Sequence, residues 1–220
     1  MELNRYIDHT LLKADATEEE IKQLCQQAKD YNFKAVCVNS CWIEYCLACL
    51  KGSDTSVCCV IGFPLGANLS EAKAAEARCA VAKGVNEIDM VINIAYLKDG
   101  KYEALVNDIK MVKEACGDII LKVIIETCLL NDSEKQLATK AVVDAGADFV
   151  KTSTGYSLGG ATVGDVILMK AVTKGKIKIK AAGGVKTVSD LKAMIEAGAD
   201  RIGTSRGVAL MGGNNSDQEY

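Results

Sequence analysis

Short apolar segments alternate with amphipathic segments along nearly the whole chain, and this alternation constrains the fold more than any other feature. Seven apolar segments are short and rich in β-branched residues. They are apolar on both faces, as in parallel strands covered by helices. They are FKAVCVN (33–39), SVCCVIGF (56–63), NEIDMVIN (86–93), IILKVIIE (119–126), DFVKTS (148–153), IKIKAA (177–182) and DRIGTS (200–205). The segment YIDHTLL (6–12) is a candidate eighth strand.

The segments between these strands have the pattern of amphipathic helices. Thr17 and Glu20 have the spacing of a capping box at a helix start, and Ser70 is a candidate N-cap for another helix. Eight strand–helix units in one domain predict a TIM (β/α)8 barrel over residues 1–212. An open, doubly wound sheet is the alternative. The polar residues 213–220 are expected to form a mobile C-terminal tail.

Charge and composition argue against nucleic acids and membranes as binding partners. The net charge of −3 gives no sign of a nucleic-acid surface. No stretch of 18 uninterrupted apolar residues is present, so no membrane partner is expected. The first ten residues, MELNRYIDHT, lack the apolar segment of a signal peptide, which indicates a cytoplasmic protein.

The chain has ten cysteines, which we expect to be free thiols in a reducing compartment. A zinc site made of Cys46, Cys49, Cys58 and Cys59 is the alternative. The segment CLAC (46–49) has the pattern of a helix, and adjacent cysteines in a strand point to opposite faces. We therefore interpret these cysteines as small core residues.

Residues suited to end helices stand five positions before polar or small residues in the strands that follow. The pairs are Gly84 and Asp89, Gly117 and Lys122, Gly146 and Lys151, Gly175 and Lys180, Gly198 and Gly203, and Asn32 and Cys37. If the strands enter the sheet alike, the second members share one facing, because side chains alternate along a strand. Near the carboxyl ends of barrel strands, that facing is the active site. Lysines that reach solvent from strand ends are the structural alternative.

Converging lysines favour covalent chemistry. A free lysine has a pKa of about 10.4, but a second ammonium and a low-dielectric cavity both disfavour the charged form. The neutral amine attacks a carbonyl to form an imine, which allows a bond to the β-carbon to break or form. Asp89 is the carboxylate available to move protons. This chemistry requires no metal and no organic cofactor.

The last two strands carry the pattern of an anion site. Glycines stand at two strand-to-helix turns, in AAGGVKT (181–187) and GTSRG (203–207). Backbone N–H groups at such turns bind phosphate, and TIM barrels hold phosphate at this place. Gly183, Gly184, Gly203 and Ser205 are the candidates. Tight turns without a ligand are the alternative.

At the other end of the chain, Asp8 and Thr10 flank His9, which we interpret as structural. If YIDHTLL is the first barrel strand, these two neighbours are the better site candidates.

Motifs in order along nearly the whole chain resemble those of the deoxyribose-phosphate aldolase (DeoC) family. They are DHTLL, CVN, IGFPLGA, EIDMVIN, LKVIIET, FVKTSTG, KAAGGVKT and RIGTSRG. The resemblance implies a class I aldolase on a TIM barrel. Such an enzyme reversibly cleaves 2-deoxy-D-ribose 5-phosphate to D-glyceraldehyde 3-phosphate and acetaldehyde. It also implies small-molecule substrates and a homo-oligomer, a dimer or a tetramer.

The resemblance implies roles for individual residues. Lys151 is the imine-forming lysine, Lys180 is its electrostatic partner, and Asp89 moves protons with Lys180 and a water. The substrate pocket is expected to include Asp8, Thr10, Cys37, Lys122 and Thr152, together with the phosphate-loop residues Gly183, Gly184, Gly203 and Ser205.

Two tyrosines, Tyr156 and Tyr220, stand at positions where the family pattern bears on function. Tyr156 stands where some family members have a lysine near the phosphate, so Lys186 or Arg206 would have to supply that charge. Tyr220 ends the polar tail and resembles a family tyrosine that visits the active site, although an incidental terminal aromatic explains it equally.

Two other functions remain open from the residues alone. A pyridoxal-phosphate barrel would also use a strand-end lysine beside a phosphate site. A non-catalytic sugar-phosphate binding protein would need no reactive amine.

Overall fold

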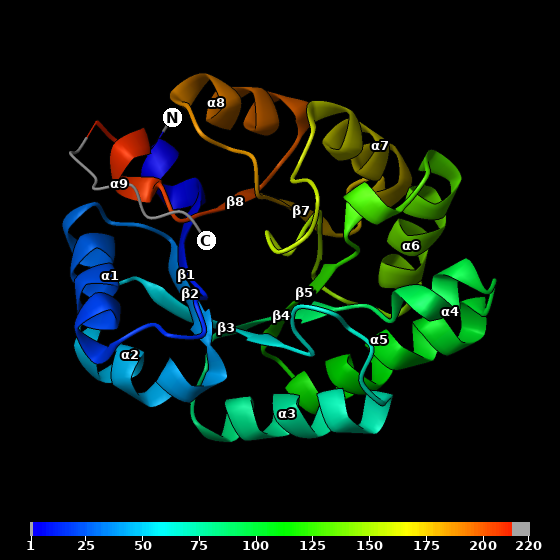
Figure 1. Cartoon of the computed structure of the whole chain (residues 1–220), viewed down its shortest axis with the longest axis horizontal. Coiled ribbons are helices and arrows are strands. Elements are labelled where there is room, and N and C mark those ends of the chain that lie inside the picture. The colour runs from blue at the N-terminus through cyan, green and yellow to red at the C-terminus, as the bar shows by residue number, and fades with distance from the viewer. Residues whose placement is uncertain (1, 213–220) are drawn as a thin grey trace.

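The computed structural model describes residues 2–212, and its centre is a closed barrel of eight parallel strands (Figure 1). The strands are β1 (Ile7–Leu11), β2 (Ala35–Asn39), β3 (Ser56–Ile61), β4 (Glu87–Val91), β5 (Ile120–Ile124), β6 (Phe149–Lys151), β7 (Lys178–Ala182) and β8 (Arg201–Thr204). Their order in the barrel follows the sequence, and β8 pairs with β1 to close it. The single-domain TIM barrel is therefore confirmed, and an open sheet is excluded. The segment YIDHTLL does contain a strand.

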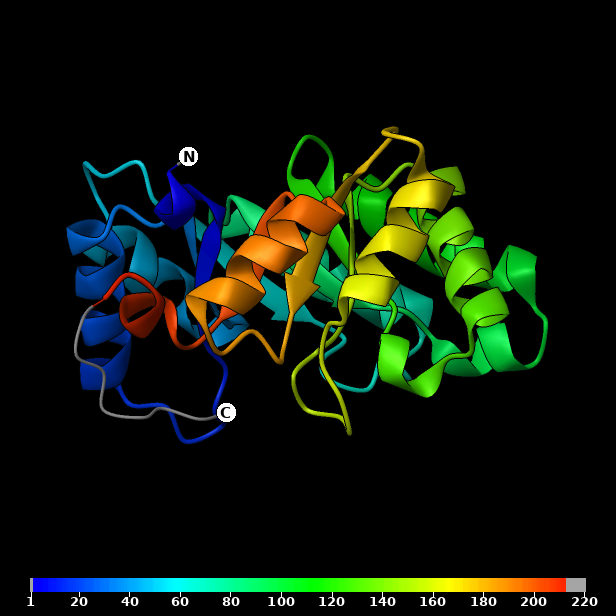
Figure 2. The ribbon, with the colours of Figure 1, turned by 90° about the horizontal axis from the view of Figure 1, so that it is seen from above.

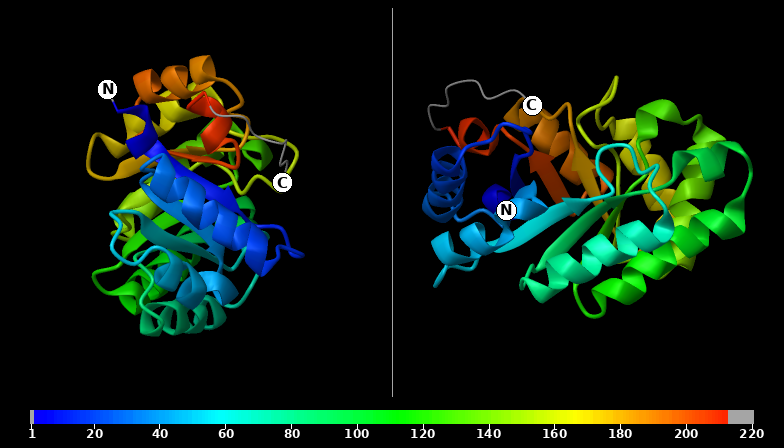
Figure 3. Two further views of the ribbon diagram at one scale, coloured as in Figure 1. Left: turned by 90° about the vertical axis from the view of Figure 1, so that its left-hand side faces the viewer. Right: turned by 60° about the horizontal axis from the view of Figure 1, so that its bottom comes forward.

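Helices surround the barrel on the outside, as the views in Figures 1, 2 and 3 show. The α-helices are α1 (Glu18–Asp30), α2 (Ile43–Cys49), α3 (Ser70–Ala82), α4 (Ile94–Lys98), α5 (Tyr102–Cys116), α6 (Asp132–Asp144), α7 (Val163–Thr173), α8 (Val188–Ala197) and α9 (Gly207–Leu210). Three 3-10 helices add to them: η1 (Leu3–Tyr6), η2 (Ser40–Trp42) and η3 (Thr127–Leu129). None of the helices within residues 2–212 is both long and apolar enough to cross a membrane.

The two predicted helix starts have different outcomes. At α1, Thr17 accepts from the backbone N–H of Glu20, and the Glu20 carboxylate accepts from Thr17, so the capping box is confirmed. At α3 the capping prediction is wrong, because the N-cap is Leu69 and Ser70 is already helical. The Ser70 hydroxyl instead donates to Asp108 at 2.8 Å, which ties α3 to α5.

The apolar core lies between the strands and the surrounding helices. Outward-facing strand residues such as Val36, Ile88 and Ile202 are fully buried in it. The inside of the barrel is different. A small apolar cluster of Leu12, Cys37, Cys58 and Val60 packs there against Phe63. TIM barrels usually fill this space with branched apolar side chains. Here, charged side chains such as Asp89, Lys122 and Lys180 are buried in it as well.

The residues that stand five positions before the inward-facing strand residues share one backbone feature. Asn32, Gly84, Gly117, Gly146, Gly175 and Gly198 all have positive φ, between 50° and 119°. The strand registers give the second member of each pair the same inward facing.

The predicted tail, residues 213–220, lies outside the described residues. Tyr220 is part of it, so its role and the boundary at residue 212 stay predictions.

Candidate active site

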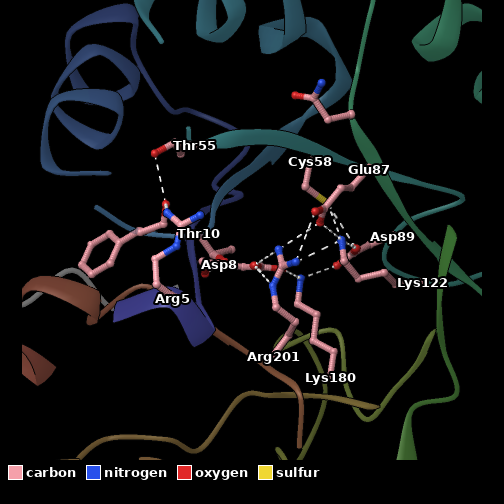
Figure 4. Close-up of polar contacts among 12 residues, drawn as sticks. Arg5, Asp8, Thr10, Thr55, Cys58, Glu87, Asp89, Lys122, Lys180 and Arg201 are labelled. Carbon is pink, nitrogen blue, oxygen red and sulfur yellow. Dashed lines mark hydrogen bonds and ion pairs between the residues drawn. The ribbon is translucent and has the colours of Figure 1, made fainter. Parts of the chain in front are cut away.

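The carboxylate of Asp89 lies at the centre of the site, inside the barrel and fully buried (Figure 4). The Nζ atoms of Lys151 and Lys180 both lie 2.7 Å from its Oδ2. The Nζ of Lys122 lies 2.8 Å from its Oδ1. These four residues come from the consecutive strands β4, β5, β6 and β7. The structure thus brings together the lysines and the aspartate that the glycine spacing places on one facing.

The structure extends this group into a closed ring of alternating charges. Its members, in order, are Arg201, Asp8, Lys180, Asp89, Lys122 and Glu87, and Glu87 returns to Arg201. Lys180 lies 2.6 Å from Asp8, and Lys122 lies 2.6 Å from Glu87. The Arg201 guanidinium binds both Asp8 and Glu87. Each carboxylate of the ring therefore bridges two cations.

The charges of the ring balance without Lys151. Three carboxylates face three cations among its six members, and Lys151 adds a fourth cation that contacts Asp89. The side chain of Lys151 is 4 % exposed, whereas those of Lys122 and Lys180 are 0 % exposed. Lys151 is thus the surplus cation of a buried cluster, and it is the most exposed of the three lysines.

The ring fixes the protonation of its members. Burial by itself raises the pKa of Asp89, but the ammonium groups of Lys122, Lys151 and Lys180 outweigh it and hold the pKa well below its usual range. Burial opposes the charge of Lys180 too, yet Asp8 and Asp89 raise its pKa. Asp89 is therefore a carboxylate at neutral pH, and Lys180 is an ammonium.

Two members of the ring, Glu87 and Arg201, were missed by the sequence analysis. Glu87 stands two residues before Asp89, and Arg201 stands two residues before Gly203. Side chains two apart in a strand share a face, so the same alternation could have found both. Asp8 was expected in the substrate pocket. The structure places it in the ring, where Arg201 and Lys180 occupy its carboxylate.

Beside the ring, the loops after β7 and β8 enclose a cavity of ≈ 240 Å³. Its lining includes all four predicted phosphate-loop residues, namely Gly183, Gly184, Gly203 and Ser205, and adds Val185, Lys186, Thr204 and Arg206. Lys186 and Arg206 bring two basic side chains to the cavity. The cavity therefore combines glycine-rich turns with basic residues, a combination suited to an anion.

Gly203 contributes to both the cavity and the ring. A Cβ atom at this position would lie 3.1 Å from Cε of Lys180, which is closer than ordinary contact. The absence of a side chain leaves the space that Lys180 occupies. Glycine at this position thus serves the lysine as well as the anion site.

The segment after Lys151 is held firmly. The hydroxyl of Thr152 donates to the carbonyl of Ala182 at 3.2 Å and accepts from its N–H at 3.0 Å. The buried carboxylate of Glu126 accepts from the backbone N–H and the hydroxyl of Thr154. Thr152 was expected to contact substrate, but its hydroxyl bridges β6 to β7. Both contacts fix the backbone that positions Lys151.

The remaining predicted residues line the barrel interior or its rim. Thr10 is buried inside, and its hydroxyl donates to the carbonyl of Asp8 at 2.8 Å. Cys37 is fully buried and is the direct partner of Cys58 across β2 and β3. The ring of Tyr156 packs edge-on against Phe63 at 5.4 Å between centroids.

The alternative four-cysteine zinc site does not form in the described part of the chain. Cys46 and Cys49 lie on α2, and Cys59 packs in the outer core. Cys58 points the opposite way, into the barrel, where its thiol lies 3.1 Å from Oδ1 of Asp89. The strand alternation used against this site explains the separation.

Comparison with known proteins identifies the family of this chain. Residues 3–213 match the family described as DeoC/LacD family aldolase. The chain is 54 % identical, over all 220 residues and the full length of the relative, to deoxyribose-phosphate aldolase of Streptococcus equi subsp. zooepidemicus. It is 55 % identical to the enzyme of that name from Brevibacillus brevis, covering 97 % of this chain and 96 % of the relative. This chain belongs to the DeoC/LacD family of aldolases.

Solved structures support the family assignment. A putative deoxyribose-phosphate aldolase from Coccidioides immitis superposes with a TM-score of 0.94 at 39 % identity, covering 96 % of this chain and 85 % of the other. The deoxyribose phosphate aldolase of Aeropyrum pernix, described as a unique tetramer, gives 0.85 at 32 % identity, covering 96 % and 89 %. The barrel of this chain therefore has the fold of solved structures described as deoxyribose-phosphate aldolases.

Proposed function

We propose that this aldolase reversibly cleaves 2-deoxy-D-ribose 5-phosphate to D-glyceraldehyde 3-phosphate and acetaldehyde through an imine on Lys151. The observation that carries the proposal is the position of one carboxylate, Asp89, at 2.7 Å from the Nζ atoms of both Lys151 and Lys180. The names of the relatives support the choice of substrate.

Lys151 is the nucleophile because it is the cation that the ring does not need. Within the described residues, its Nζ has an ion pair with Asp89 alone, whereas Lys180 bridges two carboxylates and Lys122 contacts three. Loss of a proton from Lys151 leaves three positive and three negative charges in the barrel. The neutral amine attacks C1 of the open-chain sugar and, after loss of water, forms the imine.

Cleavage then requires movement of protons near the new imine. A base removes the proton of the C3 hydroxyl, the C2–C3 bond breaks to release D-glyceraldehyde 3-phosphate, and the protonated imine nitrogen takes up the electrons to give an enamine. Protonation of C2 and hydrolysis release acetaldehyde. Asp89 is the proton acceptor in this scheme, acting through a water, and the ammonium of Lys180 is the proton donor.

The cavity after β7 and β8 is proposed to bind the 5-phosphate. The backbone of Gly183, Gly184 and Gly203 and the hydroxyl of Ser205 supply neutral donors. Lys186 and Arg206 supply charge, which compensates for tyrosine at position 156. Cys37 and Thr10 are proposed to line the pocket for the sugar carbons.

The imine is tested by trapping. Incubation with acetaldehyde and borohydride is expected to add a two-carbon group to Lys151, which peptide mass spectrometry locates. Lys151→Arg should give neither adduct nor turnover while its circular dichroism is unchanged, because a guanidinium cannot become the nucleophilic amine. An adduct confined to other lysines would refute the assignment. Release of acetaldehyde, coupled to a reporter dehydrogenase, distinguishes cleavage from binding alone.

Tyr220 is proposed to assist proton transfer at the enamine carbon. Deletion of Tyr220 is expected to slow both turnover and exchange of the acetaldehyde methyl protons with deuterium, without changing the melting temperature. Tyr220→Phe tests the hydroxyl in the same assays. Unchanged exchange in both variants would remove Tyr220 from the mechanism.

A homo-oligomer in the cytoplasm is the proposed working form. The tetrameric relative from Aeropyrum pernix supports oligomerisation. All ten cysteines are free thiols in the structure, which suits a reducing compartment. Light scattering coupled to size-exclusion chromatography is expected to give a mass two or four times that of the chain. A monomer mass would contradict the proposed assembly.

A further inference from the structure

Two thiols and one carboxylate converge beside the ion-pair ring. Cys37 and Cys58 are direct neighbours across β2 and β3, and both side chains point into the barrel. The Sγ of Cys58 lies 3.1 Å from Oδ1 of Asp89. The ligand atoms of Cys37, Cys58 and Asp89 all lie within 4.8 Å of one another, and all three residues are fully buried.

This spacing fits a tetrahedral metal ion. Zinc binds thiolate sulfur at about 2.3 Å and carboxylate oxygen at about 2.0–2.2 Å, so its ligand atoms stand roughly 3.5–3.8 Å apart. The three ligand atoms therefore need only small movements to share an ion. No other group of three such ligands lies as close together within residues 2–212. The set leaves the fourth position open.

The local charges also permit a dication at this place. Binding would release a proton from each thiol, so two new negative charges offset the two positive charges of the ion. Lys122, which lies 3.3 Å from the Cys58 sulfur, would keep Glu87 as a partner at 2.6 Å.

We propose that Cys37, Cys58 and Asp89 form an inhibitory binding site for a thiophilic divalent cation such as Zn²⁺. The bound ion takes Oδ1 of Asp89 as a ligand, and a water or an oxygen of the substrate fills the open position. Asp89 is then no longer available to accept a proton. Binding of the ion stands on the geometry alone, whereas inhibition rests on the proposed role of Asp89.

Binding is tested with Co²⁺, whose bonds to thiolates give intense charge-transfer absorption. The full chain is kept reduced with a non-thiol reductant during the titration. It is expected to bind one equivalent of Co²⁺, with the charge-transfer absorption of thiolate ligands and the absorption bands of a tetrahedral cobalt ion. Cys58→Ser should weaken binding at least about tenfold, a loss seen even for outer-shell partners of metals. Cys59→Ser is the matched control, because Cys59 is adjacent and buried but lies on the other face of β3.

The outcomes separate clearly. Equal cobalt spectra in Cys58→Ser and Cys59→Ser would overturn the site, since the metal would then lie elsewhere. If Cys58→Ser does not fold, as judged by circular dichroism, Cys37→Ser in the same titration gives the answer. Affinity for Zn²⁺ should rise with pH, because two protons are released on binding.

Inhibition is measured separately. Stoichiometric Zn²⁺ is expected to suppress acetaldehyde release by the unmodified protein and by Cys59→Ser, and a chelator should restore it. Full turnover with Zn²⁺ bound would overturn the inhibitory role. If the cobalt spectrum appears but acetaldehyde is never trapped on Lys151, the metal site stands and the proposed aldol chemistry fails.

Discussion

Each ionised side chain inside the barrel depends on its partners. A buried carboxylate or ammonium is costly unless another charge or a set of hydrogen bonds compensates it. The ring supplies two opposite charges to every member. Neutralising one member therefore leaves each of its two neighbours in the ring with one opposite charge fewer. This dependence makes the ring residues sensitive to substitution even where they touch no substrate.

Glu87→Gln tests this dependence through stability. The change leaves Lys122 and Arg201 with one carboxylate partner fewer, and breaking a buried pair costs about 3 kcal/mol or more. We expect a loss of that size in the free energy of unfolding, measured by urea denaturation. Glu114→Gln, at an exposed position on α5, should change stability by no more than about 0.5 kcal/mol. Equal values for the two variants would contradict the ring.

The pH dependence of stability tests the charge of Asp89. Its pKa is lower in the folded protein than in the unfolded chain, so the unfolded state takes up the proton first as pH falls. The stabilisation is complete above the unfolded pKa, about 3.9, and is lost at lower pH. The difference in unfolding free energy between the unmodified protein and Asp89→Asn should stay constant from about pH 7 to 5 and shrink below about pH 4. A difference that stays constant at low pH would show that Asp89 is not held as an anion.

At the scale of elements, the strands β7 and β8 place Lys180 next to the cavity that is proposed to bind phosphate. The same glycine, Gly203, lines this cavity and leaves space for Lys180. The pairing of β7 with β8 puts Ala182 opposite Gly203. Ala182 stands two residues after Lys180 in β7, so both side chains lie on the same face of the strand. The anion site and the lysine are thereby held in a fixed relation by backbone hydrogen bonds.

Gly203→Ala is expected to lower kcat at least about tenfold. The new methyl group would push Cε of Lys180 away from Asp89, and misplacement of a catalytic group by about 1 Å can cost a hundredfold. Stability should fall by only about 1–3 kcal/mol, as for other overpacked sites. Gly164→Ala on α7 is the control, because the nearest atom to its Cβ is 3.8 Å away. Wild-type kcat in Gly203→Ala would show that Lys180 needs no such space.

At the scale of the whole molecule, the thiols are distributed between surface and interior. Cys41, Cys79 and Cys128 are exposed, Cys49 is half-buried, and the other six are buried. Cys37 and Cys58 are among the buried ones, inside the barrel. Solvent access, not the number of cysteines, therefore decides which thiols react in the folded protein.

A thiol reagent is expected to modify the three exposed cysteines rapidly in the native protein and all ten after unfolding, without any reductant. Mass spectrometry counts the modified thiols in both states. A chelator should leave turnover unchanged, because the proposed imine chemistry uses no metal. Fewer than ten reactive thiols after unfolding would indicate a disulfide, and activity lost to the chelator would require a resident metal.

The sequence predicted the barrel and most of the central group because both depend on local repeats. Helix-ending residues with positive φ stand five positions before Asp89, Lys151 and Lys180, and the period of two in a strand relates the facing of these three side chains. These relations span only five residues. They were therefore readable along the chain without knowledge of how distant segments meet.

Only the tertiary structure decided how the charges are paired. The contact between Asp8 and Arg201 joins residues 193 positions apart, and it exists because β8 pairs with β1 to close the barrel. Closure places Asp8 in the ring, and it brings Arg201 to Glu87. Patterns within a short segment do not show which distant residues will become partners. A charge buried in a low-dielectric interior is nevertheless costly unless an opposite charge pairs with it. The sequence by itself thus determined which side chains face inward, and the closed barrel determined which of them neutralise one another.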